Sequence, residues 1–185
     1  MIDDTLLEAE DKMDKAVEAA KDDFATIRTG AASPAMFAKL MVEYYGAPTP
    51  LQQLASITTQ DARTIVITPY DQGALGDIET SVRNSDLGVN PTNDGHVIRI
   101  NMPQLTEERR TEYVKVAHHR AEEARVVVRN HRRKAKEAIE SAVKEGEVGE
   151  DDGARAEKEL EGMTKKHTDA IDALLAHKES ELLEV

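Results

Sequence analysis

The chain has 185 residues, carries a formal net charge of −12 and contains neither cysteine nor tryptophan. The lack of cysteine excludes disulfides, thiolate nucleophiles and cysteine-based zinc sites, and 3% aromatic residues are too few for a platform that stacks single-stranded bases. The acidic N-terminus has no apolar core and no run of about 18 apolar residues occurs, so we expect a cytoplasmic protein without a secretory signal or membrane-spanning helix.

An amphipathic helix is predicted over residues 3–28. Its apolar positions recur at spacings of three, four or seven residues, at Leu6, Met13, Val17, Ala20, Phe24 and Ile27. Thr29 and Gly30 provide a stop signal, and Pro34 cannot lie far inside a helix.

The composition then changes, because the chain from about residue 35 to 104 is rich in Pro, Gly, Thr and β-branched residues. Strands are expected at residues 42–46 (with a turn), 55–58, 64–68 and 97–100, with a helix at 74–85 and turns at 90–91 and 93–95. These elements predict a small α/β or β-rich domain with a thin core.

Helix returns at Thr106, which is predicted to cap a helix that runs to about residue 145. Residues 146–149 break the pattern, and a further helix is expected over residues 151–183. Its apolar stripe contains Leu160, Met163, His167, Ala170 or Ile171, Leu174 and Leu182.

Three long amphipathic helices bury their apolar stripes most economically against one another. We therefore predict an α+β fold: an elongated three-helix bundle (residues 1–30 and 105–185) with an inserted small β/α/β domain (31–104) and an L-shaped outline. Two short crossings, at 30–34 and 101–104, are expected to act as a hinge of limited freedom. The hinge residues are Thr29, Gly30, Ala31, Ala32, Ser33, Pro34, Asn101, Met102, Pro103 and Gln104.

The second long helix carries an unusual concentration of positive charge. Between Arg109 and Lys136, ten Lys or Arg residues stand against three Glu in a chain that is acidic overall. At about 100° per residue, five of them fall within an arc of roughly 100°. We call this set the basic face: Arg125, Arg129, Arg132, Arg133 and Lys136.

A phosphate-bearing partner would explain the basic face. No Glu stands four residues before Arg129, Arg132 or Arg133, so their mutual repulsion costs stability unless a partner offsets it. A guanidinium group can donate two parallel hydrogen bonds to a phosphate, which favours RNA or DNA as the partner. Two alternatives stay open: an ordinary solvated face, and a seam in which acidic residues of the first and third helices pair with these arginines.

Enzymatic motifs are missing from the sequence. It contains no phosphate-cradling Gly-rich loop, no H-E-x-x-H and no G-x-S-x-G, so no catalytic residue is predicted. His118 and Glu122 share a helical face and could bind a metal, but they lack a third ligand, so a solvated histidine is the preferred interpretation and no metal is predicted.

Several stretches of the chain resemble the bacterial ribosome recycling factor family, and the likeness covers nearly its whole length. The matching stretches are residues 27–34 (IRTGAASP), 43–46 (EYYG), 49–51 (TPL), 54–56 (LAS), 85–91 (SDLGVNP), 103–110 (PQLTEERR), 128–133 (VRNHRR) and 178–182 (KESEL). One position departs from the family pattern, because Ala31 stands where the family usually has Arg.

The resemblance implies a three-helix bundle with a hinged inserted domain and a transfer-RNA-like outline. It implies binding between the ribosomal subunits after termination and, with elongation factor G and its GTP hydrolysis, dissociation of the subunits. No cofactor is expected, and we expect a monomer. The family's main contacts with large-subunit ribosomal RNA correspond to Arg129, Arg132 and Arg133, and the RNA-binding prediction also includes Arg28, Arg109 and Arg110.

Two other classes of protein remain open as alternatives. The first is a coiled-coil scaffold or adaptor that binds protein through its third helix. The second is a ribosome-associated stress factor that blocks the ribosome instead of recycling it.

Overall fold

The structure, a computed structural model, describes residues 1–184 and divides into two compact units. The bundle unit contains Met1–Phe24 and Lys115–Glu179. The sheet unit contains Ala25–Val114 and the C-terminal residues from Ser180 onward. The domain bounds expected from the sequence, 1–30 with 105–185 and 31–104, stay a prediction.

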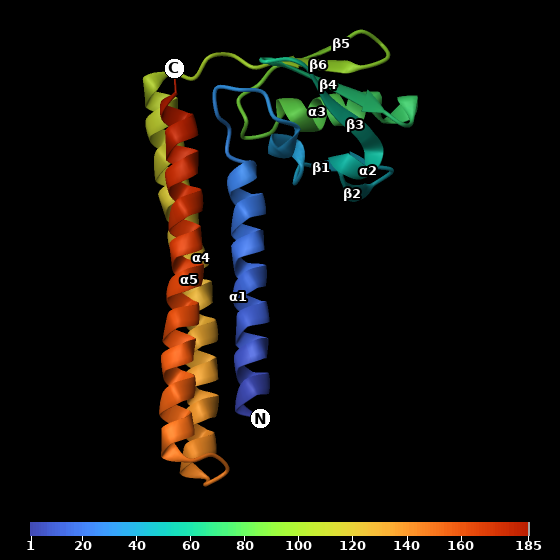
Figure 1. Cartoon of the computed structure of the whole chain (residues 1–185). Helices are drawn as coiled ribbons and strands as arrows, with labels where there is room; N and C mark the ends of the chain where they lie inside the picture. Colours follow the sequence, from blue (N-terminus) through green and yellow to red (C-terminus); the bar gives the residue numbers. More distant parts are fainter. Residues whose placement is uncertain (185) are drawn as a thin grey trace. The chain divides into compact units, whose positions relative to one another are not determined.

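Most of three long helices belongs to the bundle unit, and the helices run side by side in Figure 1: α1 (Ile2–Ala25), α4 (Glu107–Lys144) and α5 (Glu150–Leu183). The first and third helices were predicted from their apolar periodicity, and the second from the cap at Thr106 and the helical pattern that follows it. Each helix buries large apolar side chains: Met13, Val128, Ile139, Leu160 and Ile171 are at most 1% exposed. None of the helices in residues 1–184 has the length and apolar character needed to cross a membrane.

The first helix ends at Ala25, three residues before the predicted end at residue 28. The next residues, Ile27, Arg28 and Thr29, are buried one after another. An amphipathic helix buries one face, and three successive buried residues depart from that pattern. The predicted last turn was therefore wrong.

The ends of the second long helix agree with the predicted signals. The backbone N–H of Arg109 donates to Thr106 Oγ1 at 3.1 Å, which confirms Thr106 as the N-cap. After Lys144, Gly146 adopts a φ of 75°, and the amides of Gly146 and Glu147 donate to the carbonyls of Val143 and Ala142. Gly146 thus reverses the chain and separates α4 from α5.

A four-stranded antiparallel sheet forms most of the sheet unit, in the order β3 (Ala55–Asp61), β4 (Thr64–Pro69), β6 (Ile98–Asn101) and β5 (Pro91–Asn93). Ile65 and Ile67 of β4 lie opposite Ile100 and Ile98 of β6, and all four are fully buried. The helix α3 (Leu75–Arg83) adds Ile78 and Val82 to this core. The expected α+β fold with a small sheet domain is confirmed.

A separate hairpin is formed by β1 (Met41–Tyr44) and β2 (Ala47–Pro50). Its two-residue loop contains Tyr45 at φ 50° and Gly46 at φ 79°, as a hairpin turn of type I′ requires. Tyr44 is half-buried and its hydroxyl donates to Asp71 at 2.9 Å, whereas Tyr45 is exposed.

Several short elements were not predicted: β2, β5, the single-turn helix α2 (Leu51–Leu54) and the 3-10 turns η1 (Pro34–Phe37) and η2 (Gln72–Ala74). The two strands contain Pro48, Pro50 and Pro91, and proline argues against a strand. Both strands lie at edges, where a missing backbone donor costs no ladder hydrogen bond.

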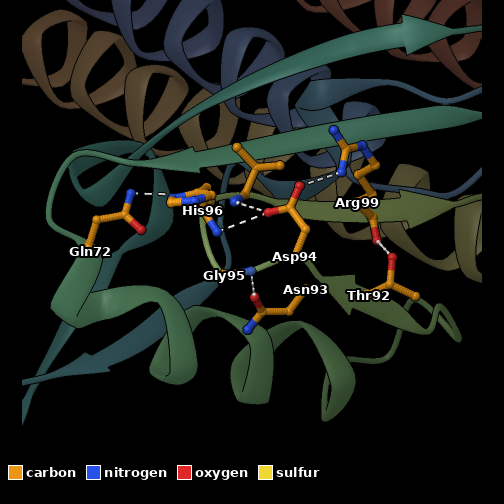
Figure 2. Close-up of polar contacts among 8 residues, drawn as sticks. Gln72, Thr92, Asn93, Asp94, Gly95, His96 and Arg99 are labelled. Atoms are coloured by element: carbon orange, nitrogen blue, oxygen red, sulfur yellow. Dashed lines mark hydrogen bonds and ion pairs between the residues drawn. The ribbon is translucent and has the colours of Figure 1, made fainter.

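The turn between β5 and β6 is held by one carboxylate (Figure 2). Asp94 Oδ1 accepts hydrogen bonds from the amides of His96 and Val97, both at 2.9 Å, and Asp94 Oδ2 accepts from Arg99 Nη1 at 2.7 Å. The two amides, and then Arg99, hold the pKa of Asp94 far below its usual range. Asp94 is therefore negatively charged near neutral pH.

Candidate nucleic-acid interface

All five side chains of the basic face lie on α4 within the bundle unit and reach solvent. Arg129, Arg133 and Lys136 have side chains that are 52%, 61% and 47% exposed. Arg132 is 36% exposed, and Arg125 is the most covered at 20%. The helix buries Ala121, Val128, Ala135 and Ile139 on another face, so the basic residues lie outside the core.

Two of these arginines make ion pairs with α5. Arg125 Nε lies 2.8 Å from Asp172 Oδ1, and Arg132 Nη1 lies 2.9 Å from Glu161 Oε1. These contacts correspond to the alternative in which acidic residues of the third helix pair with the basic face. They position both guanidinium groups along the α4–α5 seam without burying either group fully.

Other partners of the basic face come from α4 itself, and the sequence analysis missed most of them. Glu137 and Glu140 stand four residues after Arg133 and Lys136, at 3.3 and 4.0 Å, whereas only the positions four residues upstream were considered. Arg129 pairs with Glu122 at 3.5 Å. Exposed pairs of this kind contribute about 0.2–1 kcal/mol each, so a phosphate can displace them at small cost.

The strength of the internal pairing differs along the face. Burial acts to lower the pKa of Arg125, but its hydrogen bonds to Asp172 and Glu122 outweigh burial and raise the pKa overall. Arg132 Nε is enclosed and has no hydrogen-bond partner among residues 1–184. Arg125 is therefore the most firmly held of the arginines, while Arg132 retains unused donor capacity.

The structure does not place Arg28 on an exposed surface. Its side chain lies in the sheet unit, where Nη2 donates to the carbonyl oxygen of Pro103 and only 5% of the residue is exposed. Burial lowers the pKa of the guanidinium from its ordinary value. An RNA phosphate could not reach this group without local unfolding, so we leave Arg28 out of the interface.

Arg109 and Arg110 also belong to the sheet unit, in the first turns of α4. Arg109 is 55% exposed and lies 3.7 Å from Glu112. Arg110 is half-buried, with its Nη2 at 3.5 Å from the carbonyl of Leu105. Of these two, only Arg109 presents most of its side chain to solvent.

Hydrogen bonds anchor both predicted hinge segments to the turn between β3 and β4. The amide of Ala32 donates to the carbonyl of Ala62 at 2.9 Å, and the amide of Met102 donates to the carbonyl of Arg63 at 2.7 Å. Ala31 is exposed and nothing lies within 4 Å of a Cβ at Gly30. The remaining hinge residues continue these segments: Thr29, Ser33, Pro34, Asn101, Pro103 and Gln104.

No group of three metal-ligating side chains gathers anywhere in residues 1–184. His118, considered above with Glu122, contacts Glu179 of α5 through Nε2. Its ring is thus engaged in a contact between helices within the bundle unit.

Comparison with known protein families gives a match over most of the chain. The family model described as ribosome recycling factor matches residues 20–183. Two similar relatives, both called ribosome-recycling factor, come from Renibacterium salmoninarum (63% identical) and Kineococcus radiotolerans (65% identical). Each alignment covers all 185 residues and the full length of the relative.

Solved structures show the same likeness. A solution structure of the ribosome recycling factor is 43% identical, with a TM-score of 0.75, and the match covers 100% of this chain and 98% of the other. A second match is a chain from the models of the T. thermophilus ribosome recycling factor and the E. coli elongation factor G bound to the E. coli post-termination complex. It is 42% identical, with a TM-score of 0.69, and both chains are covered completely.

Proposed function

The chain belongs to the ribosome recycling factor family, and on that premise we propose that it binds the post-termination ribosome between the subunits and, together with elongation factor G and GTP, promotes their dissociation. It is a translation factor and not an enzyme, so the free energy for dissociation comes from the partner's GTP cycle. We place this activity in the cytoplasm, where bacterial translation occurs.

The single observation that carries the RNA-binding part of the proposal is the basic face. An acidic chain concentrates exposed arginines on one side of α4, with Arg129, Arg132 and Arg133 between 36% and 61% exposed. Their intramolecular carboxylate partners are themselves exposed and are weakly bound. These guanidinium groups would anchor the bundle to phosphates of large-subunit ribosomal RNA.

The inserted domain would pivot about residues 29–34 and 101–104 when elongation factor G acts on it. The hydrogen bonds of Ala32 and Met102 support this, because they fix the ends of both segments that adjoin the sheet. The backbone before residue 32 and after residue 102 would then absorb the change in dihedral angles. Gly30, where an added Cβ would meet nothing within 4 Å, is suited to such a change.

A subunit-dissociation assay tests the proposed function. Post-termination ribosomes are incubated with the purified chain, elongation factor G and GTP, and free subunits are measured by light scattering or sedimentation. We expect dissociation that requires all three components and fails with a non-hydrolysable GTP analogue.

The alternatives give different results in the same assay. A protein scaffold would not sediment with ribosomes at all. A stress factor would sediment with ribosomes but leave the subunits associated after elongation factor G and GTP are added.

A further inference from the structure

A second group of basic side chains lies on the other flank of α4, toward α1. Lys12 of α1 and His131 and Lys134 of α4 line a cavity of about 210 Å³ within the bundle unit. The other lining residues are Thr5, Glu8, Ala9, Ala135 and Ala138. At about 100° per residue, His131 and Lys134 lie roughly 140–200° around the helix from Arg129, so this cavity is separate from the basic face.

The charges around this cavity are not balanced. Lys12 pairs with Glu8 at 2.9 Å, and Glu8 is the only acidic residue of the lining. Lys134 makes no ion pair with any residue in the described part of the chain. The lining therefore holds two ammonium groups and one carboxylate, which pairs with Lys12, in a protein that has an excess of acidic residues elsewhere.

His131, which also lines the cavity, carries an unused hydrogen-bonding atom. Its Nδ1 atom is enclosed and has no hydrogen-bond partner within residues 1–184. Burial, followed by the charges of Lys12 and Lys134, lowers the pKa of this imidazole. An unsatisfied buried polar atom is costly, and an oxygen-bearing anion would both supply an acceptor and offset the lysine charges.

The set of donors indicates the class of anion. Two lysines and one histidine, from two helices, line the same small cavity, and each side chain carries a group that can donate a hydrogen bond. A tetrahedral phosphate can accept from three directions, and it fits the available volume. The hydroxyl of Thr5 already donates to the carbonyl of Met1, so the lysines and the histidine supply the recognition.

We propose that the cavity lined by Lys12, His131 and Lys134 is a phosphate-binding site, and that on the ribosome the bound group is an RNA phosphodiester. The first part is independent of the function proposed above, whereas the second part rests on it. The helix α4 then contacts RNA on two sides, through the basic face on one side and through this cavity on the other.

Titration with inorganic phosphate tests the first part. The Cε1–H signal of His131, assigned with the variant His131→Gln, is followed by NMR while phosphate replaces chloride at constant ionic strength. We expect phosphate to raise the pKa of His131, and the double variant K12Q/K134Q to lower the phosphate affinity at least tenfold. Glu8→Gln removes the only carboxylate of the lining and should increase the affinity.

A matched control has the same change in net charge. The variant K15Q/K165Q neutralises two exposed, ion-paired lysines of α1 and α5 that lie outside the cavity, and it should bind phosphate like the parent chain. Thermal unfolding by circular dichroism verifies that all variants are folded. A His131 signal that does not respond to phosphate, or an equal response in K12Q/K134Q, would overturn the proposal.

Ribosome binding tests the second part. We expect K12Q/K134Q to weaken ribosome binding about 5- to 30-fold and to reduce the slope of log affinity against log salt by one to two, relative to K15Q/K165Q. If the parent chain binds phosphate but K12Q/K134Q keeps the ribosome affinity of K15Q/K165Q, the cavity is a site for free phosphate and the RNA assignment is overturned. The proposed function is measured separately by subunit dissociation with the parent chain, so the two failures are distinguishable.

Discussion

Arg132 Nη1 lies 2.9 Å from Glu161 Oε1, so a side chain expected to bind RNA is engaged by a carboxylate of the neighbouring helix. Both side chains of the pair are partly exposed to solvent, Arg132 at 36% and Glu161 at 56%. It orients the guanidinium along the α4–α5 seam, and an RNA phosphate must compete with Glu161 for it.

Replacing Arg132 with Ala should weaken ribosome binding by about 1–3 kcal/mol. It should also reduce the slope of log affinity against log salt concentration by about one. Affinity is measured by ribosome sedimentation at two or more salt concentrations. Arg155→Ala is the control, because Arg155 is 77% exposed on α5 and lies outside the basic face. Equal affinity and equal slope for the two variants would remove Arg132 from the interface.

Replacing Glu161 with Gln should have the opposite effect. The competing carboxylate is lost while the shape of the side chain is retained, so ribosome affinity should rise by about 0.2–1 kcal/mol, or up to about fivefold. The increase should diminish at high salt, which screens the original pair. A decrease in affinity would mean that Glu161 serves mainly to position Arg132.

Two glycines of α5 should respond oppositely to replacement by Ala. A Cβ at Gly153 would lie 2.5 Å from Val143 Cγ2, and the β-branched Val143 cannot easily rotate away, so Gly153→Ala should destabilise the bundle by about 1–3 kcal/mol. Nothing lies within 4 Å of a Cβ at Gly162, and Gly162→Ala should stabilise by about 0.5–1 kcal/mol. Chemical denaturation followed at 222 nm measures both, and the same sign for the two variants would contradict the packing at Gly153.

Acid should weaken the β5–β6 turn through Asp94. Its pKa is depressed in the folded state, so its charge stabilises the turn above the ordinary carboxyl pKa and this contribution declines as the pH falls below about 4. Asp94→Asn should therefore lower the melting temperature at pH 6, and the difference from the parent should narrow toward pH 2.5. NMR signals of the His96 and Val97 amides, which donate to Asp94, report the protonation of Asp94.

Asp86→Asn is the control for this experiment, because Asp86 is exposed and accepts none of the hydrogen bonds of the turn. Its melting-temperature difference from the parent should not follow the pH pattern of Asp94→Asn. A constant difference for Asp94→Asn across the pH range would show that the charge of Asp94 contributes nothing to the turn.

Local signals were sufficient for the long helices. The cap at Thr106, the break at Gly146 and the apolar periodicities act between residues close in sequence, and the structure confirms them. The last turn of the predicted first helix was wrong because the sheet unit buries Ile27, Arg28 and Thr29 together. The edge strands β2 and β5 were missed because their prolines argue against a strand unless its edge position is known.

The amino-acid sequence by itself determined the three helices, the α+β class, the family and the arc of arginines on α4, since helical periodicity and short motifs depend on near neighbours. Only the tertiary structure decided which cations are free to meet a phosphate. Arg125 and Arg132 meet carboxylates 47 and 29 residues away, Arg28 is enclosed, and Lys134 is brought to the same cavity as Lys12. Charge compensation and burial depend on how the helices pack, and a pattern read along one helix cannot contain that information.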